Sequence, residues 1–77
     1  MMAKKICNWK TVSGRNGFVQ EESASIFSKK WVVYEKGKRF LGLGSEKIGE
    51  LRPDLKLDEL LKELEKIIGE EVIIWKV

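Results

Sequence analysis

The last third of the chain constrains the fold most, because it has the pattern of one amphipathic helix, a stop and a strand. Apolar residues recur there at the spacing of one helix face, and charged residues fill the opposite face. Gly69 follows the last apolar position, where a left-handed residue commonly ends a helix. The apolar stripe consists of Leu57, Leu60, Leu61, Leu64, Ile67 and Ile68.

The two ends of this helix lead to separate expectations. At its start, Asp54 offers a capping oxygen, whereas Lys56 as N-cap places Glu59 at the third helical position, and both remain open. After its end, residues 72–77 form a nearly continuous apolar run of β-branched and aromatic side chains. Such a run is typical of a strand covered on both faces, or of one buried against a partner chain.

Four strands are expected before the helix. The first two flank a turn at residues 13–17 that contains the hairpin dipeptide Asn16-Gly17. Residues 23–28 either continue the second strand after a bulge or form a loop. The last two strands form a hairpin that pairs Val33 with Phe40, unless a three-residue loop shifts the register, and residues 45–52 are expected to be irregular. The four expected strands are Lys4–Val12, Phe18–Glu22, Trp31–Tyr34 and Arg39–Leu41.

The sequence therefore predicts a single small α+β domain over residues 1–77, with the order β-β-β-β-α-β. One C-terminal amphipathic helix packs on a mainly antiparallel sheet in two layers. If the fourth and the terminal strand share one sheet, the helical connection makes them parallel. The expected core consists of Ile6, Val33, Phe40, Leu41, Leu60, Leu61, Leu64, Ile67, Ile68, Ile73 and Trp75.

Absent residue types narrow the chemistry. The chain has no histidine and one cysteine, so neither a transition-metal site nor a Ser-His-Asp or Cys-His catalytic group is expected. Cys7 is expected to be a small buried residue on a strand. These observations predict a protein that is not an enzyme and that binds no cofactor or metal.

The same composition bears on where the chain resides. No apolar stretch approaches the roughly 20 residues that span a bilayer, and no apolar segment of a secretory signal follows residues 1–10. A lone cysteine cannot form an internal disulfide, which favours a reducing compartment. We therefore expect a cytoplasmic protein that does not contact membranes.

Charge is distributed unevenly along the chain. Residues 1–43 carry nine basic and three acidic side chains, whereas residues 44–77 carry six basic and nine acidic ones. In a meander, alternate turns lie at one end of the sheet, so cations from two hairpins are expected to converge on one rim and to bind phosphates. Two aromatic residues on the sheet would stack on bases. The predicted nucleic-acid-binding residues are Arg15, Lys36, Lys38, Arg39, Trp31 and Tyr34.

Other interpretations of these residues remain open. Hairpin tips carry charge because they are solvated, and Trp31 and Tyr34 are equally suited to the core. The sequence does not distinguish single-stranded from double-stranded nucleic acid. The alternative function is a protein–protein interaction or homodimerisation module that uses the C-terminal strand, since an exposed strand edge pairs readily.

The predicted architecture resembles that of coactivator domains that bind single-stranded nucleic acid. The resemblance lies in four strands followed by a helix and in the basic character of the sheet. No residue motif supports it, and those domains do not need the additional strand at residues 72–77. It therefore assigns no family and no site residue to this chain.

Overall fold

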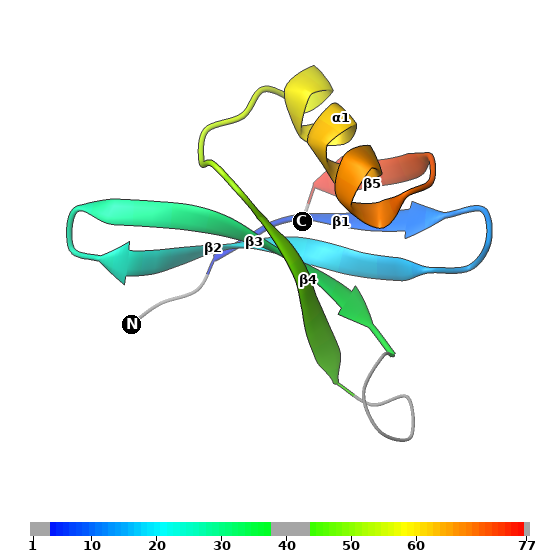
Figure 1. Ribbon diagram of the computed structural model, residues 1–77, viewed down its shortest axis with the longest axis horizontal. Coiled ribbons are helices and arrows are strands. Elements are labelled where there is room, and N and C mark those ends of the chain that lie inside the picture. Colours follow the sequence, from blue (N-terminus) through cyan, green and yellow to red (C-terminus); the bar gives the residue numbers. More distant parts are fainter. Residues whose placement is uncertain (1–3, 38–43, 77) are drawn as a thin grey trace.

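The structure, a computed structural model, describes residues 4–37 and 44–76 and contains the predicted elements in the predicted order (Figure 1). The predicted α+β class and the order β-β-β-β-α-β are confirmed. No helix among the described residues has the length and apolarity that crossing a membrane requires. The elements are β1 Lys4–Thr11, β2 Asn16–Ser25, β3 Ser28–Lys36, β4 Ser45–Leu51, α1 Leu57–Ile68 and β5 Val72–Lys76.

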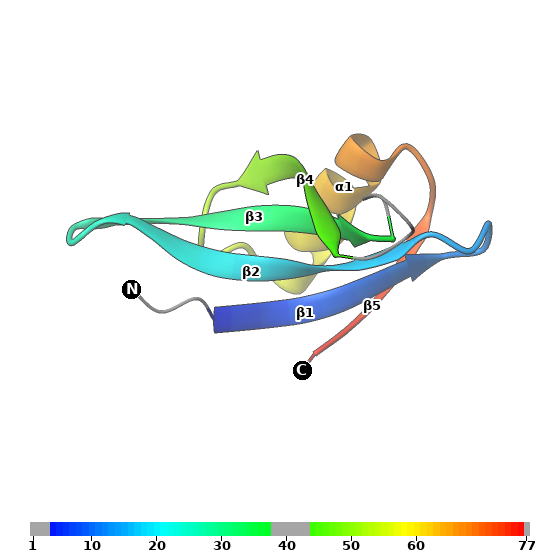
Figure 2. The same ribbon diagram turned by 90° about the horizontal axis from the view of Figure 1, so that it is seen from below.

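The strands form one antiparallel sheet in the order β4-β3-β2-β1-β5. The first four strands are a meander, and α1 carries the chain across the sheet so that β5 pairs with β1. Because every neighbouring pair is antiparallel, β4 and β5 run in the same direction at opposite edges, as predicted. Helix α1 covers one face, and the view from below in Figure 2 looks onto the other face. We call this second face the open face.

Helix α1 follows the sequence prediction closely. Its N-cap is Lys56, whose backbone N–H donates to the Glu59 carboxylate at 3.2 Å, so the choice between the two candidates falls on Lys56. Gly69 ends the helix in the left-handed conformation, with φ of 85°. The residues that α1 buries fully against the sheet are Leu60, Leu64 and Ile68.

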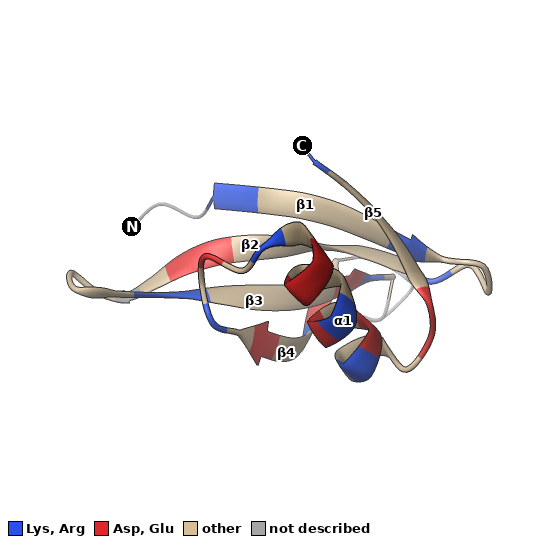
Figure 3. Ribbon diagram, turned by 90° about the horizontal axis from the view of Figure 1, so that it is seen from above, with Lys and Arg blue, Asp and Glu red and all other residues tan. Residues whose placement is uncertain are grey.

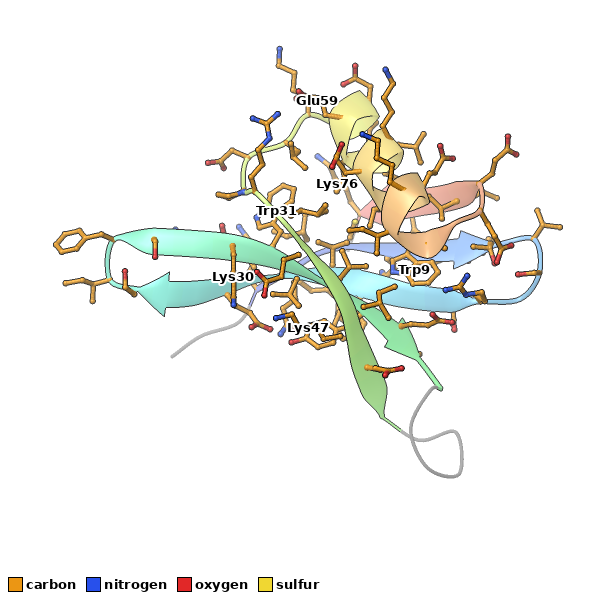
Figure 4. All side chains as sticks on the ribbon, viewed as in Figure 1. Trp9, Lys30, Trp31, Lys47, Glu59 and Lys76 are labelled. Carbon is orange, nitrogen blue, oxygen red and sulfur yellow. The ribbon has the colours of Figure 1, made fainter. Side chains whose placement is uncertain are left out.

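The core lies between α1 and the covered face of the sheet, and Trp9 and Trp31 are both in it (Figure 4). Of the predicted core, Val33 and the helix positions are buried or packed against it, while Phe40 and Leu41 lie outside the described residues. The prediction for the terminal strand is wrong in part. Ile73 and Trp75 retain 55% and 46% exposure, because β5 alternates and α1 covers only one of its faces.

The predicted fourth strand lies outside the described residues, and the structure corrects the predictions for the segment that follows it. Residues 45–52 were expected to be irregular, but β4 occupies Ser45–Leu51 and pairs Val33 with Gly49 rather than with Phe40. The register shifts between Val33 and Tyr34, which marks a bulge. This pairing places Leu51 in the core and Gly49 beneath α1, and both contacts depend on the helix.

The two other hairpin connections also refine the prediction. The first turn spans residues 12–15, with Gly14 at φ of 100°, so Asn16-Gly17 begins β2 instead of forming the turn. Strand β2 continues past residue 23 after a register shift, which is one of the two alternatives left open. The β2–β3 hairpin then ends in a tip at which Ile26 and Phe27 are both about nine-tenths exposed.

Candidate nucleic-acid interface

The open face carries a row of side chains that crosses the whole sheet. Strand registers place one residue of each strand directly beside the next, and side chains of paired residues point to the same face. At about 4.8 Å between strands, the row extends roughly 19 Å. From β5 to β4 it consists of Trp75, Asn8, Phe18, Tyr34 and Lys47.

Lysines from neighbouring positions lie over the aromatic rings of this row. The rings of Phe18 and Tyr34 stack with their centroids 5.0 Å apart. Lys5 Nζ lies 4.8 Å and Lys36 Nζ 6.0 Å from the Phe18 centroid, while Lys10 Nζ lies 5.8 Å from that of Trp75. A lysine over a ring within about 6 Å is a cation–π contact. Flat apolar surfaces and positive charges therefore occupy the same patch.

The acidic side chains of the open face have partners within the protein. Lys30 and Lys47, which project from this side in Figure 4, both pair with Glu50. The hydrogen bond from Lys47 and then that from Lys30 hold the pKa of Glu50 below its ordinary value. Glu22 accepts a hydrogen bond of 2.5 Å from the Tyr34 hydroxyl, and this bond raises the pKa of Tyr34.

Three lysines remain available on this face. Among the residues that the structure describes, no carboxylate pairs with Lys5, Lys10 or Lys36. The outer side of α1 carries acidic side chains interspersed with lysines (Figure 3). The open face therefore carries lysines that no carboxylate of the described residues neutralises.

The structure divides the predicted site residues. Lys36 and Tyr34 both lie on the open face, within reach of Phe18. Trp31 lies on the covered face and is only 8% exposed, so its ring is not available for stacking on a base. Lys38 and Arg39 lie outside the described residues.

Arg15 is at the expected end of the sheet but on its covered side. Its guanidinium makes a two-point contact with Glu35, at 3.0 Å from Nε and 2.9 Å from Nη2. Nη1 also donates to the carbonyl of Ile68 at the end of α1 and to Glu70. Arg15 therefore links the first turn, β3 and the helix end, and its donors are occupied within the protein.

Sequence reasoning missed Phe18, Lys5, Lys10 and the exposed position of Trp75. Alternation within β3 already separates Trp31 from Tyr34, because residues three apart on a strand point to opposite faces. The same rule places Phe18 with Gln20 and Glu22 on the polar face of its strand. The neighbours across the sheet depend on registers that the sequence alone does not specify.

Cys7 is buried beside α1, as expected, and this burial raises the pKa of its thiol from 9.0 to about 11. We expect native protein at about pH 8 to react with an aromatic disulfide reagent at least about 100-fold more slowly than urea-unfolded protein, because the thiolate is the nucleophile. Stability should fall as the pH rises above about 9, since the unfolded thiol ionises first. Equal native and unfolded reaction rates would contradict this.

Comparison with protein-family models, curated proteins and solved structures finds no match to this chain. The architectural resemblance to coactivator domains thus gains no support from a matching structure. Among the described residues, no three side chains of the metal-binding types lie close enough together to hold a metal ion.

Proposed function

We propose that the protein is a small non-catalytic module that binds single-stranded nucleic acid on its open face, in the cytoplasm. The observation that carries the proposal is the contact of Lys5, Lys10 and Lys36 with the rings of Phe18 and Trp75. Rings that accept a base and cations that neutralise phosphates are the two components of non-specific single-strand binding. The lone buried cysteine supports the location.

Binding would proceed by counterion release and stacking. The three lysines, free of carboxylates, exchange their contacts with rings for contacts with phosphates, which releases condensed cations from the strand. Trp75, half-exposed at the end of the row, offers its ring face to a base. The row of roughly 19 Å accommodates roughly four nucleotides of a partly extended strand. Single strands are favoured over duplex, because stacking needs an unpaired base.

The first test measures the salt dependence of binding. We expect a labelled single-stranded oligonucleotide to bind at about 50 mM salt, and the affinity to fall with a log–log slope near −2 for three phosphate contacts. Replacing Lys5, Lys10 and Lys36 with Gln should abolish most of this slope. The matched control replaces Lys56, Lys62 and Lys66 on the outer side of the helix region with Gln. Equal losses in the two variants, or no binding by the wild type, would refute the proposal.

The second test uses the natural fluorescence of the protein. Trp75 is exposed whereas Trp9 and Trp31 are buried, so a stacked base should quench the emission of Trp75 selectively. Trp75→Leu should remove the quenching and weaken binding about 10-fold, within the range of one stacking contact. Phe27→Leu, which changes an exposed aromatic residue at the β2–β3 tip, should leave both unchanged. Full quenching in the Trp75→Leu variant would rule out stacking at this position.

A further inference from the structure

Strand β5 has an unpaired outer edge whose backbone groups can be assigned. Its neighbour is β1, and no described strand lies on its other side. Val72 donates its N–H to Glu65 Oε2, and its partner Thr11 donates to the Arg15 carbonyl, so these two residues do not bond each other. Since bonded and non-bonded pairs alternate along an antiparallel ladder, Val72, Ile74 and Lys76 direct their backbone groups outward.

The same edge is apolar on both faces. Ile73 and Trp75 are half-exposed on the open face, and Leu57 at the start of α1 is 64% exposed on the covered side. A cavity of about 240 Å³ opens here between the helix and the edge strand. An exposed edge with apolar side chains on both faces pairs readily with another strand. The cavity is lined by Ile6, Cys7, Leu57, Leu60, Ile74, Trp75 and Lys76.

We propose that a second copy of this chain pairs with β5, antiparallel, about a two-fold axis at Ile74. Ile74 lies at the centre of Val72–Lys76, so this register sets all five residues of both strands opposite one another. Ile73 then faces the partner's Trp75, an aromatic and β-branched pair of the kind that stabilises sheets. Ile74 exchanges two backbone hydrogen bonds with the partner's Ile74. The partner strand then closes the cavity from outside.

Charge complementarity favours a second copy over an unrelated strand. Lys76 is the charged residue of β5, and in this register it lies opposite the partner's Val72. That Val72 N–H is held by the carboxylate of Glu65, so Lys76 meets the partner's Glu65 on the covered face. The two-fold axis makes this ion pair twice. Lys76 of β5 and Glu65 of α1 thus supply both halves of the ion pair from the same chain.

Pairing at β5 also extends the open face, a consequence that rests on the proposed function. The row that ends at Trp75 continues onto the partner's Ile73 and Lys10, and both helices stay on the opposite face. A single strand can then cross five strands of each copy. We expect the affinity for an oligonucleotide of about eight nucleotides to exceed that for one of four by well over 10-fold, through effective concentration.

The association itself is tested without nucleic acid. Because five residues of each strand make the contact, we expect it to bury less than the standard of about 1,600 Å² and to be weak. Sedimentation equilibrium should therefore span about 1–500 µM and show a monomer–dimer transition. Ile73→Lys, at a half-exposed position, should keep the circular dichroism of the fold and remain monomeric throughout. Ile26→Ser with Phe27→Ser, which removes the other exposed apolar pair, should dimerise like wild type. A wild type that is monomeric at the highest concentration would overturn the proposal.

Cysteine crosslinking tests the register. In a Cys7→Ala background, Ile74→Cys should form an intermolecular disulfide on mild oxidation, because paired residues bring their Cα atoms within disulfide distance. Ile73→Cys and Trp75→Cys should crosslink much more slowly, since each lies two residues from its own copy across the axis. Fastest crosslinking at 73 or 75, or none at all, would reject this arrangement. Association is measured on wild-type protein without nucleic acid, and four-nucleotide binding on wild-type protein at concentrations where it is monomeric, so failure of the dimer and failure of the nucleic-acid proposal are distinguishable.

Discussion

Trp9→Ala should lower the free energy of unfolding by about 3–5 kcal/mol, the largest effect we expect from one substitution. Trp9 is the largest fully buried side chain of the described residues, with no measurable exposure. Its indole crosses Gly17 on β2 and donates from Nε1 to the backbone carbonyl of Tyr34 on β3, at 3.1 Å. Removal of the ring opens a cavity and leaves a carbonyl without this donor. Urea denaturation followed by far-UV circular dichroism measures the loss.

Two further variants test the separate contributions of packing and of the hydrogen bond to the stability that Trp9 provides. Trp9→Phe retains most of the apolar ring but no donor, so we expect a cost of about 1–2 kcal/mol. Gly17→Ala tests the close approach from the other side, because its Cβ would lie 1.9 Å from the Tyr34 carbonyl oxygen and 2.8 Å from Trp9 Cε2. Such overpacking should cost about 3 kcal/mol. A Gly17→Ala protein as stable as wild type would contradict this account of the contact.

Gly17 illustrates what the sequence conveys and what it does not. Asn16-Gly17 is a strong local signal for a two-residue turn, and the turn does lie nearby. The glycine nonetheless serves a contact between strands, since the Trp9 ring occupies the space of its side chain. Residues far apart in the sequence decide its role. The helix was predicted correctly because its stripe and its terminal Gly69 are local features.

Strand β4 shows the complementary case. Its apolar residues Ile48 and Leu51 are three apart and do not alternate, so no strand pattern is visible in the sequence. The bulge opposite Val33 and Tyr34 shifts the phase of the strand, and Ile48 then packs against the core. Only pairing with β3 and cover from α1 make this segment a strand. Its assignment therefore required the tertiary structure.

The sequence did not specify which residues make up the candidate site. The surplus of cations in the first half of the chain indicated the sheet as the basic surface, and Lys5, Lys10 and Lys36 do lie there without a paired carboxylate among the described residues. Which lysines meet which rings depends on register, because Lys10 and Trp75 are neighbours only through the pairing of β1 with β5. The apolar run at the C-terminus did not reveal whether this chain or another covers it. In the structure one side of that strand remains uncovered.

Arg15→Ala should destabilise the protein by about 2–4 kcal/mol, because it removes the main cation from a buried carboxylate. The Glu35 side chain is only 4% exposed, and Arg15 contacts both of its oxygens. The value lies below that of a fully buried pair, since Arg15 itself is one-third exposed and water will replace part of the contact. Arg15→Lys keeps the charge but not the two-point geometry, and should lose about half as much.

The double variant Arg15→Met with Glu35→Leu separates the role of Arg15 in folding from a role in binding. Replacing both partners with apolar residues should restore stability to within about 1 kcal/mol of wild type, because no charge is then left buried. Denaturation of wild type, Arg15→Met, Glu35→Leu and the double variant gives the coupling free energy directly.

The folded double variant lacks the Arg15 guanidinium, so oligonucleotide titration then tests whether Arg15 contacts phosphate. We expect an unchanged salt slope, because the donors of Arg15 face Glu35, Ile68 and Glu70 rather than the open face. A slope that becomes shallower by a full phosphate contact would return Arg15 to the nucleic-acid site.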